Sequence, residues 1–262
     1  MEWLGYIASV CIGIVLGVLG GGGSILSIPI LVYLFHLDAV TASAYSLFIV
    51  GMTSLVGAIP KYREQLINLR TGLLFGIPSI FSIFCTRKWI VPSIPDVMTL
   101  GETDITKRFL LLGLFSVLMI LASISMIRKN EVVVQDFDHP RKGLVIFEGI
   151  LIGFLTGLVG AGGGFLIIPA LVLLTGLPFK TAVGTSLLII AINSLLGFAG
   201  DVLNYTIDWG FLFGITALAI TGIFIGSYLT GKISGVRLRQ GFGWFVLISG
   251  LGILARELSI LF

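Results

Sequence analysis

Charged side chains are scarce in this chain of 262 residues: Lys, Arg, Asp and Glu together make up 11%, and there are only two histidines. The central parts of its long apolar segments contain none of these ionisable residues. Ionisable groups inside a membrane usually mark proton relays and pumps, so the segments give no sign of one. Near the segment ends we expect interface or helix-end roles for His36, Asp38, Glu148, Asp201 and Asp208.

Cysteine is also rare, and its two copies, Cys11 and Cys85, lie inside apolar stretches without CxxC spacing or a histidine neighbour. Such cysteines are interpreted as small buried residues and not as metal or redox ligands. The sequence contains no recognisable set of nucleophile, paired carboxylates or metal ligands. It therefore predicts neither an enzyme nor a cofactor, and a net charge of +3 gives no sign of nucleic-acid binding.

Apolar residues dominate instead: 56% of the chain is hydrophobic and the mean hydropathy is +1.11. A soluble domain of this composition would expose far too much apolar surface. Lipid admits only helices or closed barrels, and these segments are too long and too uniformly apolar for barrel strands. We therefore predict an all-α, multi-pass protein of the plasma membrane, with the lipid bilayer as its surroundings. Its apolar spans are 3–35, 40–59, 71–90, 108–127, 144–175, 182–200, 207–230 and 241–262.

A glycine-rich signature occurs twice in the chain. Residues 13–34 read GIVLGVLGGGGSILSIPILVYL and residues 153–174 read GFLTGLVGAGGGFLIIPALVLL. The two copies align without a gap at an offset of 140, with 20 identities over residues 13–57. The chain is thus predicted to contain two copies of one unit: a first repeat at 1–127, a cytoplasmic linker at 128–143 and a second repeat at 144–262.

The spans 3–35 and 144–175 are too long for one ordinary crossing of about 30 Å of hydrocarbon. Each contains a run of glycines, which are poor helix formers, followed by Pro29 or Pro169. We interpret each span as two helical segments joined at a glycine turn. If both spans turn back, the Lys and Arg residues divide 11 to 5 across the membrane, whereas eight simple crossings divide them 8 to 8. The biased division favours two repeats of inverted topology.

The glycines have two interpretations. Pairs four residues apart allow membrane helices to pack closely, as expected for Gly13 with Gly17, Gly153 with Gly157, Gly160 with Gly164 and Gly222 with Gly226. Consecutive glycines favour an unwound turn whose backbone N–H groups, with the N-terminus of the next helix, can bind an anion. The candidate substrate-binding residues in these turns are Gly20, Gly21, Gly22, Gly23, Ser24, Gly160, Gly162, Gly163 and Gly164. A nucleotide-binding loop is not indicated, because no lysine follows the glycines.

Polar residues recur in the helix predicted after each glycine turn. They can bond to carbonyls of their own helix or join neighbouring helices. Their paired positions also suit them to hold anion oxygens as neutral donors. The candidate substrate-binding residues of this kind are Thr41, Ser46, Thr53 and Ser54 in the first repeat, and Thr181, Thr185, Ser186, Asn193 and Ser194 in the second.

The doubled motif, GVLGGGGSILSIPILVYLF with TASAYSLFIV and GLVGAGGGFLIIPALVLLTG with TAVGTSLLIIAINSLLGF, resembles the TauE/SafE family of sulfite and organosulfonate exporters. The resemblance covers nearly the whole chain. It implies a membrane transporter that exports sulfite, sulfoacetate or related sulfur-containing or carboxylate anions.

These observations predict a secondary transporter of small anions that works by alternating access at a midplane site between the two glycine turns. The alternatives are an uncoupled anion channel, in which the turns form a filter, and a non-transporting membrane scaffold. The coupling ion, the physiological anion and homo-oligomerisation stay open.

Overall fold

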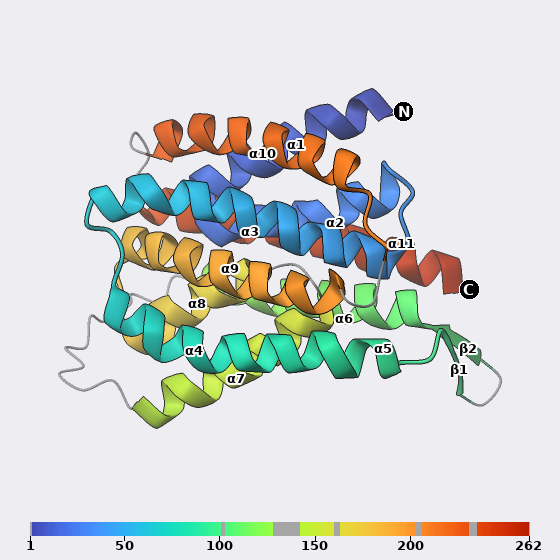
Figure 1. Cartoon of the computed structure of the whole chain (residues 1–262). Coiled ribbons are helices and arrows are strands. Elements are labelled where there is room, and N and C mark those ends of the chain that lie inside the picture. Colours follow the sequence, from blue (N-terminus) through green and yellow to red (C-terminus); the bar gives the residue numbers. More distant parts are fainter. Residues whose placement is uncertain are drawn as a thin grey trace.

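The computed structural model of the chain describes residues 2–100, 103–127, 142–159, 163–202, 206–230 and 235–261 (Figure 1). Nearly all of these residues are helical, as predicted. In the first half the elements are α1 (Glu2–Leu19), η1 (Gly20–Gly23), α2 (Ser24–Tyr33), α3 (Ala39–Arg63), α4 (Leu69–Cys85), η2 (Thr86–Ile90), α5 (Val91–Ser93), β1 (Val97–Leu100), β2 (Thr103–Thr106) and α6 (Lys107–Ile127). In the second half they are α7 (Lys142–Val159), α8 (Gly164–Thr175), α9 (Phe179–Val202), α10 (Trp209–Thr230) and α11 (Gly235–Leu261).

Within the described residues, five helical segments are long and apolar enough to cross a membrane. They are Ala39–Arg63, Leu69–Ser93, Lys107–Ile124, Phe179–Val202 and Trp209–Leu229. The outer helices expose large apolar side chains such as Phe81, Phe147 and Phe224, as expected for surfaces in contact with lipid. The small antiparallel hairpin of β1 and β2 lies beyond α5 at one end of the molecule.

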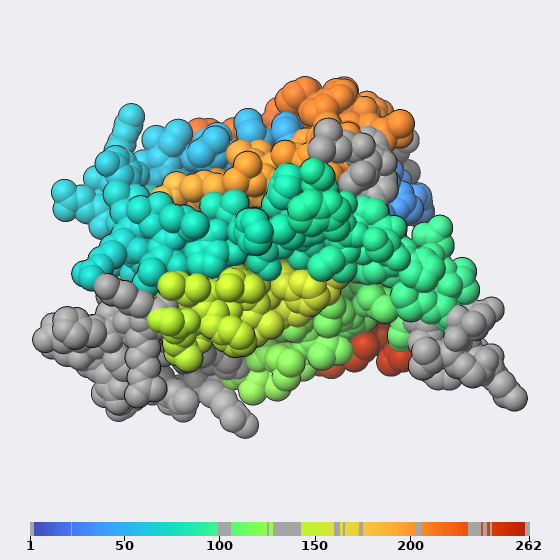
Figure 2. Space-filling view, turned by 60° about the horizontal axis from the view of Figure 1, so that its bottom comes forward, coloured from blue at the N-terminus to red at the C-terminus, as the bar shows by residue number. Residues whose placement is uncertain are grey.

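Helices α3 and α9 pack against each other at the centre of the molecule. Figure 1 shows α1 with α10 along one edge, and α4 with α7 along the other. Figure 2 shows the face on which α4 and α7 lie side by side. Helices α6 and α11 form the third outer pair. Each outer pair therefore joins one helix from the first half of the chain to one from the second.

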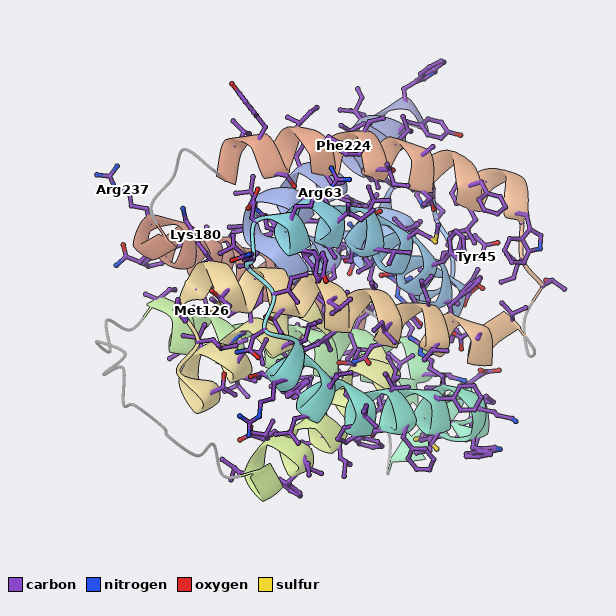
Figure 3. All side chains as sticks on the ribbon, turned by 60° about the vertical axis from the view of Figure 1, so that its left-hand side comes forward. Tyr45, Arg63, Met126, Lys180, Phe224 and Arg237 are labelled. Carbon is purple, nitrogen blue, oxygen red and sulfur yellow. The ribbon has the colours of Figure 1, made fainter. Side chains whose placement is uncertain are left out.

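The central helices are antiparallel in Figure 1, where α3 runs from right to left and α9 from left to right. Among the outer pairs, α1 runs parallel to α10 and α4 runs parallel to α7, whereas α6 and α11 are antiparallel. We call the right-hand end, where α1 begins and α11 ends, the terminal end. The opposite end, where α3 ends and α9 begins, we call the basic end; Figure 3 labels Arg63, Lys180 and Arg237 there and Tyr45 away from it.

Glycines allow the outer helices to touch backbone to backbone. A Cβ atom on Gly13 would lie 1.8 Å from the carbonyl oxygen of Ala219, and one on Gly222 would lie 2.1 Å from that of Val10. The same close approach joins α7 to α4, where a Cβ on Gly153 would lie 2.4 Å from the carbonyl oxygen of Ser79. These contacts confirm the predicted packing role of three glycine pairs. Gly160, from the fourth pair, lies outside the described residues.

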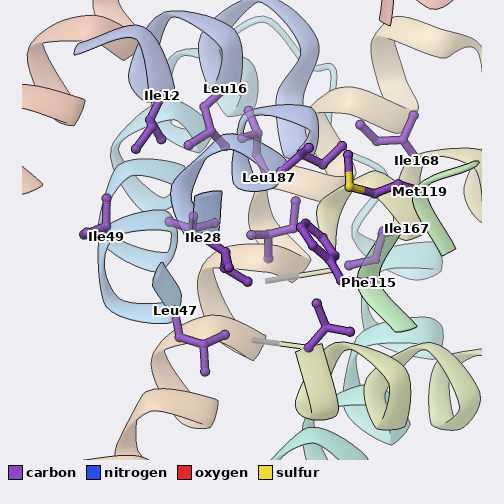
Figure 4. Packing of buried hydrophobic residues seen from close by; sticks show 14 of the residues in the cluster. Ile12, Leu16, Ile28, Leu47, Ile49, Phe115, Met119, Ile167, Ile168 and Leu187 are labelled. Carbon is purple, nitrogen blue, oxygen red and sulfur yellow. The ribbon is translucent and has the colours of Figure 1, made fainter. Parts of the chain in front are cut away.

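A single apolar core connects the two halves. It includes Ile12 and Leu16 of α1, Ile28 of α2, Leu47 and Ile49 of α3, Phe115 and Met119 of α6, Ile167 and Ile168 of α8, and Leu187 of α9 (Figure 4). All of these side chains are buried. The short helices α2 and α8 thus lie inside the bundle, where their packing fixes the glycine residues that precede them.

Candidate functional site

The two glycine runs meet inside the molecule. A Cβ on Gly21 would lie 2.3 Å from the Cα atom of Gly164, and a Cβ on Gly164 would lie 2.2 Å from the Cα of Gly21. No residue with a side chain fits at either position without a shift of the backbone. Gly21 also lies against Ile190, halfway along α9. The contact is therefore deep between the two ends, and in this conformation it leaves no space for an anion directly between Gly21 and Gly164.

Two glycines in these runs have left-handed backbone conformations. Gly20 has φ +64° and Gly163 has φ +66°, values that favour glycine over residues with a Cβ atom. Gly20 lies at the start of the 3₁₀ turn η1, and Gly163 directly precedes α8. Gly22 lies within η1, and Gly23 packs against Leu16 of α1. Gly160 and Gly162 lie outside the described residues.

Four polar groups near the middle of α3 and α9 are buried without a complete set of hydrogen bonds. Thr53 Oγ1 and Ser54 Oγ of α3 have no partner, and neither has Ser194 Oγ of α9. Asn193 donates from Nδ2 to Ser79 Oγ at 2.6 Å, whereas its Oδ1 atom has no partner. Buried polar groups are normally hydrogen-bonded, so this layer is the one most suited to receive a polar ligand.

These four residues occupy equivalent positions in the two repeats. Thr53 aligns with Asn193, and Ser54 aligns with Ser194. Because α3 and α9 are antiparallel and Gly51 lies against Leu195, the two pairs fall at the same level of the bundle. We call Thr53, Ser54, Asn193 and Ser194 the polar layer.

Other predicted hydroxyls already have partners. Ser24 donates to the carbonyl oxygen of Gly21 at 2.6 Å, and Ser186 donates to that of Val183 at 2.8 Å. Ser46 shares a short hydrogen bond with Ser27 of α2. The bond between Ser27 and Ser46 joins α2 to α3, whereas the bonds of Ser24 and Ser186 connect residues three positions apart in the chain. Thr41 and Thr181 are half-buried in the first turns of α3 and α9, away from the polar layer.

Thr185 has a structural partner that its sequence position did not reveal. Its hydroxyl accepts a 2.9 Å hydrogen bond from the backbone N–H of Asn68, the residue that caps α4. In the first repeat the aligned residue is Tyr45, whose hydroxyl accepts a 2.7 Å bond from the backbone N–H of Asp208 before α10. The two side chains differ, but each connects a central helix to the start of an outer helix in the same way.

Sequence reasoning missed Thr156 of α7. A Cβ on Gly163 would lie 2.1 Å from its Oγ1 atom, which is buried without a partner. Ser79 of α4 was missed as well, although it holds Asn193 in place. No repeat pattern could identify them, because the aligned positions carry Leu16 and Ala219.

Asp201 lies at a helix end, as one of its two expected roles requires, but it is buried and not at an interface. It lies in the last turn of α9 with no exposed surface, and its Oδ2 atom accepts a 3.1 Å hydrogen bond from Nη1 of Arg87, which is also fully buried. Asp38 and Asp208 do have the predicted helix-end role, because their carboxylates accept bonds from backbone N–H groups at the starts of α3 and α10.

A shallow groove lies between α4 and α9. Its lining is apolar except for Asn193, and includes Gly72, Gly76, Ile189 and Ile192. The groove therefore brings the edge of the polar layer close to the outer surface of the bundle. Among the described residues, no group of three His, Cys, Asp or Glu side chains is placed to hold a metal ion.

A buried polar layer enclosed by helices with apolar outer faces fits a multi-pass membrane protein. The family model of the sulfite exporter TauE/SafE family matches residues 6–253, and the chain belongs to this family. It is thus a membrane transporter and not an enzyme.

Relatives match over nearly their full lengths. A probable membrane transporter protein, YdhB, of Bacillus subtilis is 27% identical over 93% of this chain and 96% of its own length. A probable membrane transporter protein of Xylella fastidiosa is 28% identical over 94% of this chain and 92% of its own. No solved structure matches the chain significantly.

Proposed function

We propose that this protein is a secondary transporter that exports small sulfur-containing or carboxylate anions, such as sulfite, sulfoacetate or related organosulfonates. The observation that carries the proposal is the polar layer, in which equivalent residues of the two repeats present buried groups without partners. Thr53, Ser54 and Ser194 can donate a hydrogen bond to an anion oxygen without binding it as tightly as a fixed positive charge would. Membership of the sulfite exporter TauE/SafE family supports the choice of substrate class.

We further infer that the two halves are inverted-topology repeats. The offset of 140 in the sequence pairs α1 with α7, α3 with α9, α4 with α10 and α6 with α11. The helix contacts follow the same pairing. When each helix is replaced by its counterpart, the contact of α1 with α10 becomes the contact of α7 with α4, and α3 packs on its own counterpart α9. The opposite directions of the paired helices in Figure 1 support the inversion. Such repeats commonly place a transporter's substrate near the midplane between them.

Each glycine run would then form the break in a helix that enters the bundle and returns. Helix α2 returns toward the terminal end after η1, and α8 returns toward the basic end after Gly163. The N-termini of α2 and α8 carry partial positive charge, which favours an anion. The contact between Gly21 and Gly164 closes the path in this conformation. Alternating access would separate the two turns as one repeat rocks against the other.

The distribution of positive charge supports one orientation. Among the described residues, seven basic residues belong to helix termini at the basic end: Lys61, Arg63, Arg70, Lys142, Lys180, Arg237 and Arg239. Five belong to the terminal end: Arg87, Lys88, Lys107, Arg108 and Arg256. An excess of Lys and Arg marks the cytoplasmic side of a membrane protein. The basic end is therefore proposed to face the cytoplasm.

Binding and flux measurements test the proposal. Purified protein should gain thermal stability from sulfite, thiosulfate, sulfoacetate or simple carboxylates, because a ligand that binds only the folded state raises its stability. Taurine, a zwitterion, should stabilise it less than sulfoacetate. In proteoliposomes, labelled anion should show saturable counterflow. Ohmic current without counterflow would identify a channel instead, and equal stabilisation by neutral and cationic analogues would contradict an anion site.

The polar layer can be tested with Thr53→Val, a change that keeps the shape of the side chain. Since the Thr53 hydroxyl is buried without a partner, its removal should leave the melting temperature unchanged or raise it. Anion stabilisation and counterflow should fall by about tenfold, the equivalent of about one hydrogen bond. Thr216→Val is the matched control, because that buried hydroxyl donates to Leu212 within α10, away from the layer. Normal counterflow by Thr53→Val would exclude this hydroxyl from the site.

A further inference from the structure

The largest fully buried side chain of the described residues is Arg87, in η2. Its Nη1 atom donates to Asp201 of α9, but its Nε and Nη2 atoms have no partner, and neither has Asp201 Oδ1. Three polar atoms of one buried ion pair are thus unsatisfied. Burying both charges is costly and is compensated only when the remaining polar atoms also find hydrogen bonds. The pair is therefore arranged to accept a further polar ligand.

The backbone around Arg87 is also unusual. Residues Thr86–Ile90 form a π-helix at the end of α4. Short π-helical segments are rare and frequently occur at functional sites. Here the segment places Arg87 against α9 with no exposed surface, whereas the next residue, Lys88, lies over the exposed ring of Trp89.

The pair is linked to the polar layer along one interface. On α4 and α9, Ser79 bonds to Asn193, and eight residues further along both helices Arg87 bonds to Asp201. Eight residues correspond to about 12 Å along a helix. The ion pair therefore lies between the polar layer and the terminal end, on the side of the pathway that is proposed to face outward.

We propose that Arg87 and Asp201 form a second, proton-linked anion site of the transporter; this inference rests on the proposed transport function. An anion arriving from the polar layer accepts hydrogen bonds from the Arg87 guanidinium and displaces the Asp201 carboxylate. Asp201 then takes up a proton from water on the side from which the anion came, because an additional negative charge in this buried site would be costly without one. When the anion leaves on the opposite side, Asp201 releases the proton to the water there and bonds to Arg87 again. The anion and the proton thus move together, and no covalent bond other than O–H changes.

The surrounding elements offer few competing titratable groups. Helices α5 and α8 and the turn η1 carry none, and the charged residues of α7, Lys142 and Glu148, belong to its first turns toward the basic end. At the terminal end Glu257 of α11 is held by Tyr33 and Arg108. Other titratable side chains of the described elements and connections at this end include Tyr6, His36, Asp38, Tyr45, Cys85, Lys88, Asp96, Lys107, Asp208 and Arg256. Asp201 is the one carboxylate of α9.

The test is flux of sulfoacetate into proteoliposomes that contain an internal pH dye. Sulfoacetate is fully ionised at neutral pH, so a proton that accompanies it must be carried by the protein. Wild-type protein should acidify the lumen as sulfoacetate enters. Asp201→Asn should still move sulfoacetate, but its acidification should fall at least tenfold. Sulfoacetate flux without acidification in the wild type would overturn the proton link alone, whereas no flux at all would overturn the transport proposal and this inference with it.

A second variant guards against misfolding, because Asp201→Asn leaves Arg87 charged and unpaired. Arg87→Gln combined with Asp201→Asn replaces the ion pair with neutral groups that can still bond to each other. This variant should fold, yet lose sulfoacetate flux by at least tenfold. The matched control is Arg108→Gln with Glu257→Gln, which removes the ion pair between α6 and α11 and should keep proton-linked flux. Proton-linked flux at the wild-type rate in the Arg87 and Asp201 double variant would show that the pair only stabilises the fold.

Discussion

Glycine residues have two different roles in this protein, and the difference is visible one residue at a time. At Gly13 and Gly222 the helix is regular, and the absence of a side chain lets α1 and α10 touch. At Gly20 and Gly163 the backbone has positive φ, so glycine is favoured by conformation as well as by space. A glycine count or a spacing rule cannot separate the two roles, because both kinds occur in the same doubled motif.

The packing role leads to a prediction for α10. Gly222→Ala should lower the free energy of unfolding by about 1–3 kcal/mol, because its Cβ would overlap the carbonyl oxygen of Val10. Gly214→Ala on the same helix is the control, since a Cβ there meets nothing within 4 Å, and alanine favours the helix. Thermal denaturation in detergent measures both variants. Equal melting temperatures would mean that α1 and α10 can separate at no cost.

At the scale of elements, the sequence predicted the helical character of the chain better than the contacts between its helices. Apolar length indicated membrane-spanning helices, and five helical segments of the described residues are long and apolar enough to cross a membrane. The pairing of Arg87 with Asp201 could not be predicted, because 114 residues separate them and each resembles an ordinary charge at the end of a span. The bond from Asn68 to Thr185 was equally hidden, because it depends on how α4 begins against α9.

The hydrogen bond from the Asn68 N–H to the Thr185 hydroxyl leads to a prediction about the candidate site. Thr185→Val should lower the free energy of unfolding by about 0.5–1.5 kcal/mol, because it leaves the Asn68 N–H without its acceptor. Tyr45→Phe should have a similar cost, since Tyr45 accepts the equivalent bond from Asp208. Melting temperature and anion-induced stabilisation should be measured together on both variants. If Thr185→Val keeps its stability but loses anion stabilisation, the hydroxyl contacts substrate and its bond to Asn68 is incidental.

At the scale of the whole molecule, equivalent helices of the two repeats end at opposite ends of the bundle. Helix α3 ends and α4 begins at the basic end, whereas α9 ends and α10 begins at the terminal end. An inverted repeat requires this arrangement, because each half then crosses the membrane an odd number of times. Two simple direct repeats would place both connections on one side. The arrangement can therefore be tested without knowledge of the substrate.

The last prediction uses cysteine labelling in a background in which Cys11 and Cys85 are replaced by alanine. Arg63→Cys, at the end of α3, should react with an impermeant maleimide only from the cytoplasmic side, because the basic end carries the excess of positive charge. Thr206→Cys, an exposed position just before α10, should react only from outside. Two matched controls are included. Lys180→Cys should react from the same side as Arg63→Cys, and Ser93→Cys should react from the same side as Thr206→Cys. Labelling of Arg63→Cys and Thr206→Cys from the same side would rule out inverted repeats, and with them a site shared between oppositely oriented glycine turns.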